Sequence, residues 1–159
     1  MKTINISIKV PGLDELLNHP NQVCLNLRKT RNGTTPFTKE ALEKVVLING
    51  EPGVYVHLWK KSAQETVVRY VGQTKKSFRK RLNRELTLEN ACCSKEFCKA
   101  MLNHMNDRDI VTVLFPDAEI AKLVTVSGCK NPEGESLRLL LEQAMVTAYN
   151  SEDLLNVHK

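Results

Sequence analysis

The sequence predicts an α/β protein in which a small central antiparallel β-sheet is flanked by helices and preceded by an N-terminal extension. Three observations predict this class. Residues 53–59 and 66–71 are rich in β-branched and aromatic side chains and enclose a short polar segment, which is typical of a hairpin. Residues 110–115 form a third strand-like run, closed by Pro116. Residues 131–148 carry apolar side chains at helical spacing.

The length and composition are those of one globular domain with an accessory segment. The chain has 159 residues, of which 42% are apolar and 26% are charged. We expect residues 1–50 to form an N-terminal accessory segment and residues 51–159 to form the main domain. Neither a signal-peptide run nor about 18 consecutive apolar residues occurs, so we expect a soluble, cytoplasmic protein without a membrane partner.

The accessory segment contains two predicted strands and one predicted helix. Residues 4–10 alternate strictly between apolar and polar side chains, and residues 23–27 repeat this alternation. We expect these two strands to form a small sheet of their own. Thr38 is a suitable N-cap for a helix that begins beside it and stops before Asn49 and Gly50.

The main domain is expected to alternate strands and helices. Ser77 is a suitable N-cap for a helix that places Arg81 on the border of its apolar face. A further helix is expected within residues 92–105. Residues 122–126 fit either a strand or the end of a helix.

The last predicted helix carries a carboxylate beside its apolar stripe. Asn131 and Pro132 are expected to be its N-cap and first residue. Helical spacing then places Glu142 at the edge of the apolar stripe, so its carboxylate would emerge where the helix meets the sheet.

The distribution of charge suggests a polyanionic partner, and the cysteines favour neither disulfides nor a zinc site. The net charge is only +5, but seven cations and no acidic residue lie between Arg69 and Arg84. Five cysteines form an odd number without a framework spacing, which favours reduced thiols. Cys93, Cys98 and His104 could be considered as zinc ligands, but their spacings do not stack on one helix face, and thiols are favoured.

Five short sequence elements occur in an order that is typical of a known protein family. They are Gly53-Val54-Tyr55, Tyr70-Val71-Gly72, Arg81 in the next helix, Glu142 in a late helix, and Asn156 fourteen residues after it. This pattern resembles the GIY-YIG nuclease family, and the resemblance covers roughly residues 52–158. It implies the GIY-YIG nuclease fold, in a compact restriction-type or phage-type member.

The resemblance implies a divalent-metal-dependent endonuclease that hydrolyses DNA to 5′-phosphate and 3′-hydroxyl ends, with Mg²⁺ or Mn²⁺ as cofactor. Phosphodiester chemistry suits the same residues. Tyr55 would activate water, Tyr70 would hydrogen-bond the water or phosphate, and Arg81 would stabilise the phosphorane. Glu142 would be the metal ligand, and Asn156 would tie the terminal segment to the site.

The cations around the predicted helix start are interpreted as nucleic-acid contacts. These residues are Lys75, Lys76, Arg79, Lys80 and Arg84. Recognition would further use the N-terminal layer, the 60–66 loop and an insertion at 117–134. Cleavage of both strands would require a homodimer or sequential nicking, since one site cuts one strand.

Alternatives remain open for single residues. Arg81 falls one position later than the family typically has, so Arg79 or Arg84 could take its place. Glu135 is a competing carboxylate, although only Glu142 has the family's distance to Asn156. Taken singly, either tyrosine would be interpreted as core packing, and Glu142 as an i,i+4 partner of Arg138.

Alternatives also remain open for the function. One alternative is a catalytically silent nucleic-acid-binding protein with the same fold, and another is a small basic protein-binding module. RNA stays open as a substrate beside DNA. A nucleic-acid binder would lose affinity steeply between about 50 and 200 mM salt, whereas a protein-binding module would not.

Overall fold

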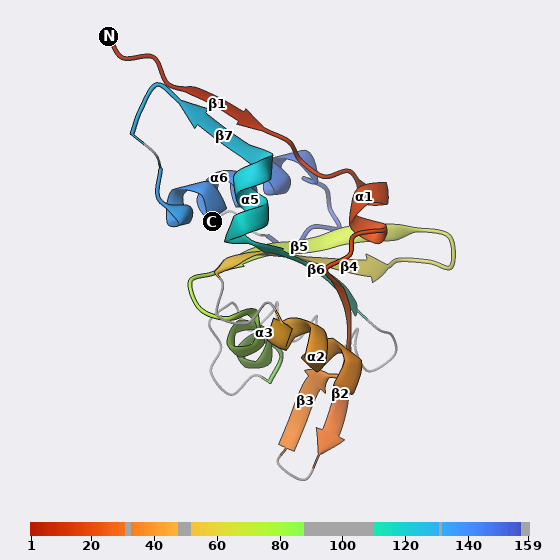
Figure 1. The fold of residues 1–159 in the computed structure, drawn as a ribbon. Coiled ribbons are helices and arrows are strands. Elements are labelled where there is room, and N and C mark those ends of the chain that lie inside the picture. The colour runs from red at the N-terminus through yellow and green to blue at the C-terminus, as the bar shows by residue number, and fades with distance from the viewer. Residues whose placement is uncertain (31–32, 48–51, 88–109, 131, 157–159) are drawn as a thin grey trace.

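The computed structural model describes residues 1–30, 33–47, 52–87, 110–130 and 132–156. Within these residues the chain forms a mixed α/β fold with a five-stranded antiparallel sheet and a two-stranded antiparallel ribbon (Figure 1). Helices lie on both faces of the larger sheet. The predicted α/β class with a small antiparallel sheet is therefore confirmed at this level.

The larger sheet has the strand order β3-β2-β6-β4-β5. Its strands are β2 (Gln22–Thr30), β3 (Gly33–Phe37), β4 (Gly53–Lys60), β5 (Thr66–Thr74) and β6 (Ile110–Pro116). The ribbon pairs β1 (Asn5–Ile8) with β7 (Val124–Ser127). The described helices are α1 (Leu13–Leu17), α2 (Lys39–Leu47), α3 (Phe78–Thr87), α5 (Asp117–Leu123) and α6 (Gly134–Ala148).

Two apolar clusters cover opposite faces of the larger sheet. One cluster joins alternate residues of β4 to α2 and α3, with Phe78 and Leu82 fully buried. The other joins the remaining residues of β4 to α5 and α6, with Ile120 and Leu141 fully buried. In Figure 1, α2 and α3 accordingly lie on one side of the sheet, and α5, α6 and the β1–β7 ribbon lie on the other.

The expectation that residues 4–10 and 23–27 form a sheet of their own is wrong. β1 pairs with β7 from the far end of the chain, and β2 pairs with β6 through Gln22↔Val113 and its neighbours. The alternation in each segment was correct, but it gives only the face of a strand and not its partner. Strands from before residue 50 therefore belong to both sheets.

Several predicted elements are confirmed. The hairpin of β4 and β5 has the expected strands and polar connection. Thr38 caps α2, since its Oγ1 accepts from the Ala41 N–H at 3.0 Å. Ser77 caps α3, since its Oγ accepts from the Lys80 N–H at 3.3 Å. The helix expected within residues 92–105 and the Asn49-Gly50 stop lie outside the described residues.

Two details near the end of the chain differ from expectation. Residues 122–126 belong to both candidate elements, because α5 ends at Leu123 and β7 begins at Val124. α6 begins at Gly134 with Glu133 as its N-cap, two residues later than Asn131 and Pro132 predicted. Arg138, in the first turns of α6, donates to Asp117 of α5 at 2.6 Å and joins the two helices.

Candidate active site

The β4–β5 hairpin brings the two predicted tyrosines together on one face of the sheet. Tyr55 lies opposite Gly72, and His57 lies opposite Tyr70. The ring centroids of Tyr55 and Tyr70 are 6.2 Å apart, with the rings tilted. Tyr55 is fully buried, whereas Tyr70 keeps part of its surface exposed. The two phenols are thus neighbours with different access to solvent.

Close packing explains why each tripeptide needs its glycine. A Cβ on Gly72 would lie 2.4 Å from the Cζ and Oη atoms of Tyr55, so the missing side chain makes room for that ring. A Cβ on Gly53 would lie 2.4 Å from Cζ of Phe78 and 2.2 Å from a backbone oxygen. Gly53 therefore allows the start of α3 to pack on the hairpin, and Gly72 allows the Tyr55 ring to pack against β5.

Arg81 is joined to the first tyrosine. It lies one helical turn after the Ser77 cap, and its N–H donates to the Ser77 carbonyl at 3.2 Å. Its guanidinium Nε donates to Oη of Tyr55 at 3.2 Å. The guanidinium also offers hydrogen-bond donors of the kind that bind a phosphate. Tyr55 and Arg81 therefore form one unit built from β4 and α3.

Glu142 approaches from α6, on the other face of the sheet. Its Oε2 accepts from Nε2 of Gln73 on β5 at 2.7 Å. Burial raises the pKa of Glu142 above its ordinary value, and the hydrogen bond from Gln73 and the charge of Arg81 oppose this rise. Arg81 thus donates to Tyr55 and also acts electrostatically on Glu142.

Asn156 fastens the C-terminal segment to the open edge of β5. Its Nδ2 donates to the Val71 carbonyl at 2.6 Å, and its Oδ1 accepts from the Val71 N–H at 2.8 Å. The Leu155 N–H donates to the Arg69 carbonyl at 2.7 Å. The side chain thus satisfies an edge residue located between Tyr70 and Gly72.

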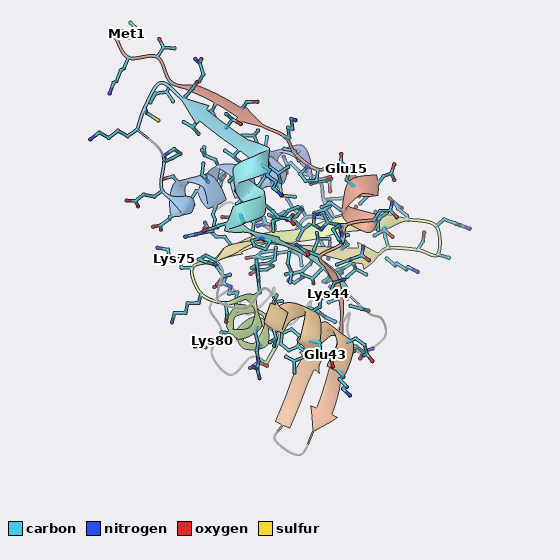
Figure 2. The ribbon with its side chains drawn as sticks, in the orientation of Figure 1. Met1, Glu15, Glu43, Lys44, Lys75 and Lys80 are labelled. Carbon is cyan, nitrogen blue, oxygen red and sulfur yellow. The ribbon has the colours of Figure 1, made fainter. Side chains whose placement is uncertain are left out.

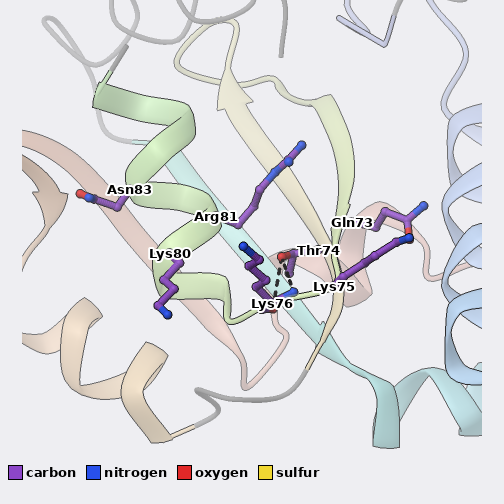
Figure 3. A pocket seen from close by; sticks show the side chains of 7 residues that line it. All are labelled: Gln73, Thr74, Lys75, Lys76, Lys80, Arg81 and Asn83. Carbon is purple, nitrogen blue, oxygen red and sulfur yellow. Dashed lines mark hydrogen bonds between the residues drawn. The ribbon is translucent and has the colours of Figure 1, made fainter. Parts of the chain in front are cut away.

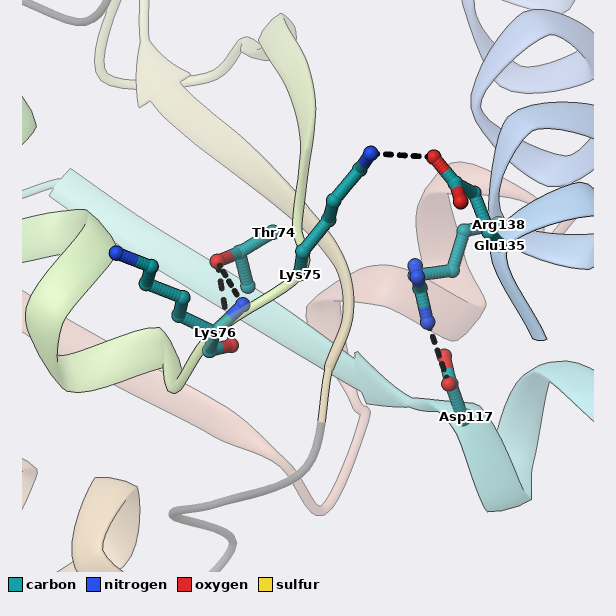
Figure 4. A network of polar contacts seen from close by, with 6 residues as sticks. All are labelled: Thr74, Lys75, Lys76, Asp117, Glu135 and Arg138. Carbon is teal, nitrogen blue, oxygen red and sulfur yellow. Dashed lines mark hydrogen bonds and ion pairs between the residues drawn. The ribbon is translucent and has the colours of Figure 1, made fainter.

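The alternative site residues lie in other surroundings. Glu135 is exposed and pairs with Lys75 at 2.5 Å, and this contact lowers the pKa of Glu135 (Figure 4). Arg138 pairs with Asp117 rather than with Glu142 (Figure 4). Arg79 is exposed, and the side chain of Arg84 lies outside the described residues. Arg81, by contrast, donates to the Tyr55 phenol.

A cavity of about 550 Å³ opens beside this unit. Polar side chains of β5, of α3 and of the turn between them line it, and four of them are cations (Figure 3): Gln73, Thr74, Lys75, Lys76, Lys80, Arg81 and Asn83. Lys75 and Lys80 also appear on the same side of the whole molecule in Figure 2. Lys80 and Asn83 further line a second cavity of about 180 Å³ with Arg79. Four of the predicted nucleic-acid contacts therefore lie around these two cavities.

Two residues near the tyrosines were not predicted. His57 is fully buried, its Nδ1 lies 2.7 Å from Oγ1 of Thr112, and its ring stacks on Tyr70 with centroids 6.0 Å apart. The period of two from Tyr55 would have placed His57 on the same strand face. Gln73 follows Gly72 directly, but its contact with Glu142 crosses 69 positions and leaves no trace in local spacing.

The donor set suits a hard divalent cation held mainly by water and substrate. The oxygens of Glu142 and Gln73 are ligands that Mg²⁺ accepts, and one or two such ligands suffice for it. In the parts of the chain that the structure describes, three or more His, Cys, Asp or Glu side chains do not gather in a metal-binding group. Cys93, Cys98 and His104 lie outside those parts.

No protein-family model matches the chain, and searches of curated proteins and of solved structures return no match. Within the described residues, no helix is long and apolar enough to cross a membrane. The function is therefore inferred from the site itself.

Proposed function

We propose that this protein is a divalent-metal-dependent endonuclease that hydrolyses phosphodiester bonds in DNA, in the manner of the GIY-YIG nucleases that its motifs resemble. One observation carries the proposal: Arg81 binds the Tyr55 phenol, acts on the Glu142 carboxylate, and lines a cavity surrounded by lysines. Arg81 thus links a candidate nucleophile activator to a candidate metal ligand, and it lines a cavity that suits a phosphate.

The residues divide the reaction among them. The oxygen of a water molecule bonds to phosphorus while the bond to the 3′-oxygen breaks, which yields 5′-phosphate and 3′-hydroxyl ends. Tyr55 takes the proton of the water, and Arg81 favours the phenolate that this requires. Tyr70, which is partly exposed, hydrogen-bonds the water or the phosphate. Arg81 also neutralises charge on the phosphoryl oxygens as the transition state forms.

The remaining residues hold the substrate and the site. Glu142 would hold Mg²⁺ or Mn²⁺, which would supply positive charge to stabilise the phosphoryl and leaving oxygens. The cations Lys75, Lys76, Arg79 and Lys80 hold the DNA backbone. Asn156 holds the C-terminal segment on β5 by donating to the backbone of Val71, the residue after Tyr70.

The test is plasmid cleavage by the full chain, with and without Mg²⁺. Wild-type protein should convert supercoiled DNA in the presence of Mg²⁺, and Glu142→Gln should lose this activity while keeping the fold. The matched control is Glu135→Gln, which changes an exposed glutamate on the same helix and should still cut. Cleavage by Glu142→Gln at the wild-type rate would sink the metal assignment.

The full burial of Tyr55 favours a second candidate, a catalytically silent nucleic-acid-binding protein. A phenol without solvent access reaches a water only if the site rearranges around substrate. This candidate predicts no cleavage under any metal condition. It also predicts DNA binding that weakens by orders of magnitude between about 50 and 200 mM salt. Fluorescence anisotropy with a labelled duplex measures this binding.

A further inference from the structure

The contact between Gln73 and Glu142 joins the edge strand of the sheet to α6. The Gln73 amide nitrogen donates to the carboxylate at 2.7 Å. The amide oxygen of the same side chain is buried and accepts no hydrogen bond from the residues that the structure describes. Buried acceptors are nearly always satisfied, so this oxygen is suited to an occupant that the protein itself does not provide.

The orientation of the amide follows from the charge of its partner. With Glu142 ionised, a flipped amide would turn one acceptor toward another and leave the NH₂ group buried without a partner. The nitrogen therefore faces the carboxylate, and the oxygen is the amide atom left without a partner among the described residues. This leaves an amide oxygen and a carboxylate on two contacting side chains, one from β5 and one from α6, and Gln73 also lines the cationic cavity.

We propose that Gln73 and Glu142 hold the divalent cation together, with the amide nitrogen fixing the carboxylate and the amide oxygen acting as a second protein ligand. This inference rests on the proposed function, because the cation is the one that the nuclease reaction requires.

The chemistry of the pair fits this ligand. Amide and carboxylate oxygens are hard donors of the type that Mg²⁺ and Mn²⁺ prefer, and Mg²⁺ is commonly held by one or two protein ligands with water and phosphate completing the shell. A water molecule on the Gln73 oxygen is the competing occupant, and it would give Gln73 no direct part in cation affinity.

The experiment is an Mn²⁺ titration of the full chain, followed by electron paramagnetic resonance of the free ion without DNA. Gln73→Met keeps an unbranched side chain but removes the amide, and it should weaken Mn²⁺ binding about tenfold or more. Gln73→Glu keeps an oxygen at the same position and adds charge, and it should bind Mn²⁺ at least as tightly as wild type. Gln143→Met is the matched control, since Gln143 is exposed and adjacent to Glu142 on α6. It should bind as wild type does.

The outcomes separate this inference from the proposed function. If Glu142→Gln loses Mn²⁺ binding and Gln73→Met keeps wild-type affinity, Gln73 is no ligand and the metal role of Glu142 stands. If Glu142→Gln binds as wild type does, the metal assignment itself fails. Weaker binding by Gln73→Glu than by wild type would overturn the ligand role, and this variant decides the matter if Gln73→Met does not fold.

Discussion

The two faces of β4 differ in kind, although they come from one strand. Val54, Val56 and Leu58 face α5 and α6 and are almost fully buried among apolar side chains. Tyr55, His57 and Trp59 face the opposite side, where they share a cluster with α2 and α3 or stack on Tyr70. A period of two thus divides the strand into an apolar face and a face of polar aromatic rings.

The difference shows how the fold separates stability from chemistry. The apolar face contributes burial alone, and nothing on it titrates. The aromatic face buries a phenol and an imidazole, and each has a polar partner, Arg81 for Tyr55 and Thr112 for His57. The candidate site lies at the β5 edge of the sheet. There Glu142, from a helix on the apolar side, accepts a hydrogen bond from Gln73 of β5.

Arg81 offers the largest effect expected from the aromatic face. Arg81→Met should lower the cleavage rate at saturating DNA by about 10²–10³-fold, because the donors to the developing phosphoryl charge are lost. Thermal stability should change little in comparison. Arg79→Met, an exposed neighbour on the same helix, should instead weaken DNA binding and reduce the salt slope by about one. Single-turnover rates and anisotropy titrations separate the two. Equal rate losses in both variants would contradict the assignment of Arg81.

Leu141 tests the apolar face directly beside a site residue. Leu141→Ala should cost about 2–5 kcal/mol of folding free energy, because the side chain is fully buried and leaves a cavity. The folded fraction should still bind Mn²⁺ and cut DNA normally. Leu139→Ala on the same helix changes a leucine that is 44% exposed and should cost about 0.5 kcal/mol or less. Urea unfolding measures both. A large loss of activity per folded molecule in Leu141→Ala would show that the two faces are not separable.

Gly72 probes the packing that places Tyr55. Gly72→Ala would put a Cβ 2.4 Å from the Tyr55 ring, so the ring or the strand must move, at a cost of about 1–3 kcal/mol. Activity should fall further than stability explains, since Tyr55 and Arg81 separate. Gly12→Ala is the control, because its Cβ would meet no atom closer than 3.9 Å. Wild-type activity in a folded Gly72→Ala protein would argue against a catalytic role for Tyr55.

The sequence predicted the hairpin, both caps and the late helix because these depend on local residue order. Thr38 and Ser77 cap their helices through contacts three residues away. The tyrosine tripeptides become neighbours through a hairpin register that the connection sets. The short distance along the chain makes such features predictable.

Long-range pairing was not predictable in the same way. The alternation in β1 and β2 was clear, yet their partners β7 and β6 lie about a hundred residues away. Only the end of α5 was considered, as one option for residues 122–126, although Asp117 and Glu119 occupy its first turn and Lys122 its last. Gln73 was missed because only the folded sheet edge brings it to Glu142.

The smallest expected effect concerns the charge of Glu142. Burial raises its pKa above 4.5, so the native state binds this proton more tightly than the unfolded chain does. The resulting stability is fully present below pH 4.5 and is lost as the pH rises through the raised pKa. Glu142→Gln cannot ionise and can still accept a hydrogen bond from Gln73. Without divalent cations, it should therefore match wild type in acid and exceed it at neutral pH.

The gain should stay below about 1 kcal/mol, because partial exposure of the carboxylate screens the effect. Urea unfolding across this pH window measures the gain. Mg²⁺ should raise the unfolding free energy of the wild type but not that of Glu142→Gln, because it binds the native state of the wild type. A difference between the two proteins that does not change with pH would mean that burial imposes no penalty on Glu142. The carboxylate would then be an ordinary surface group, and the metal role proposed for it would lose its electrostatic basis.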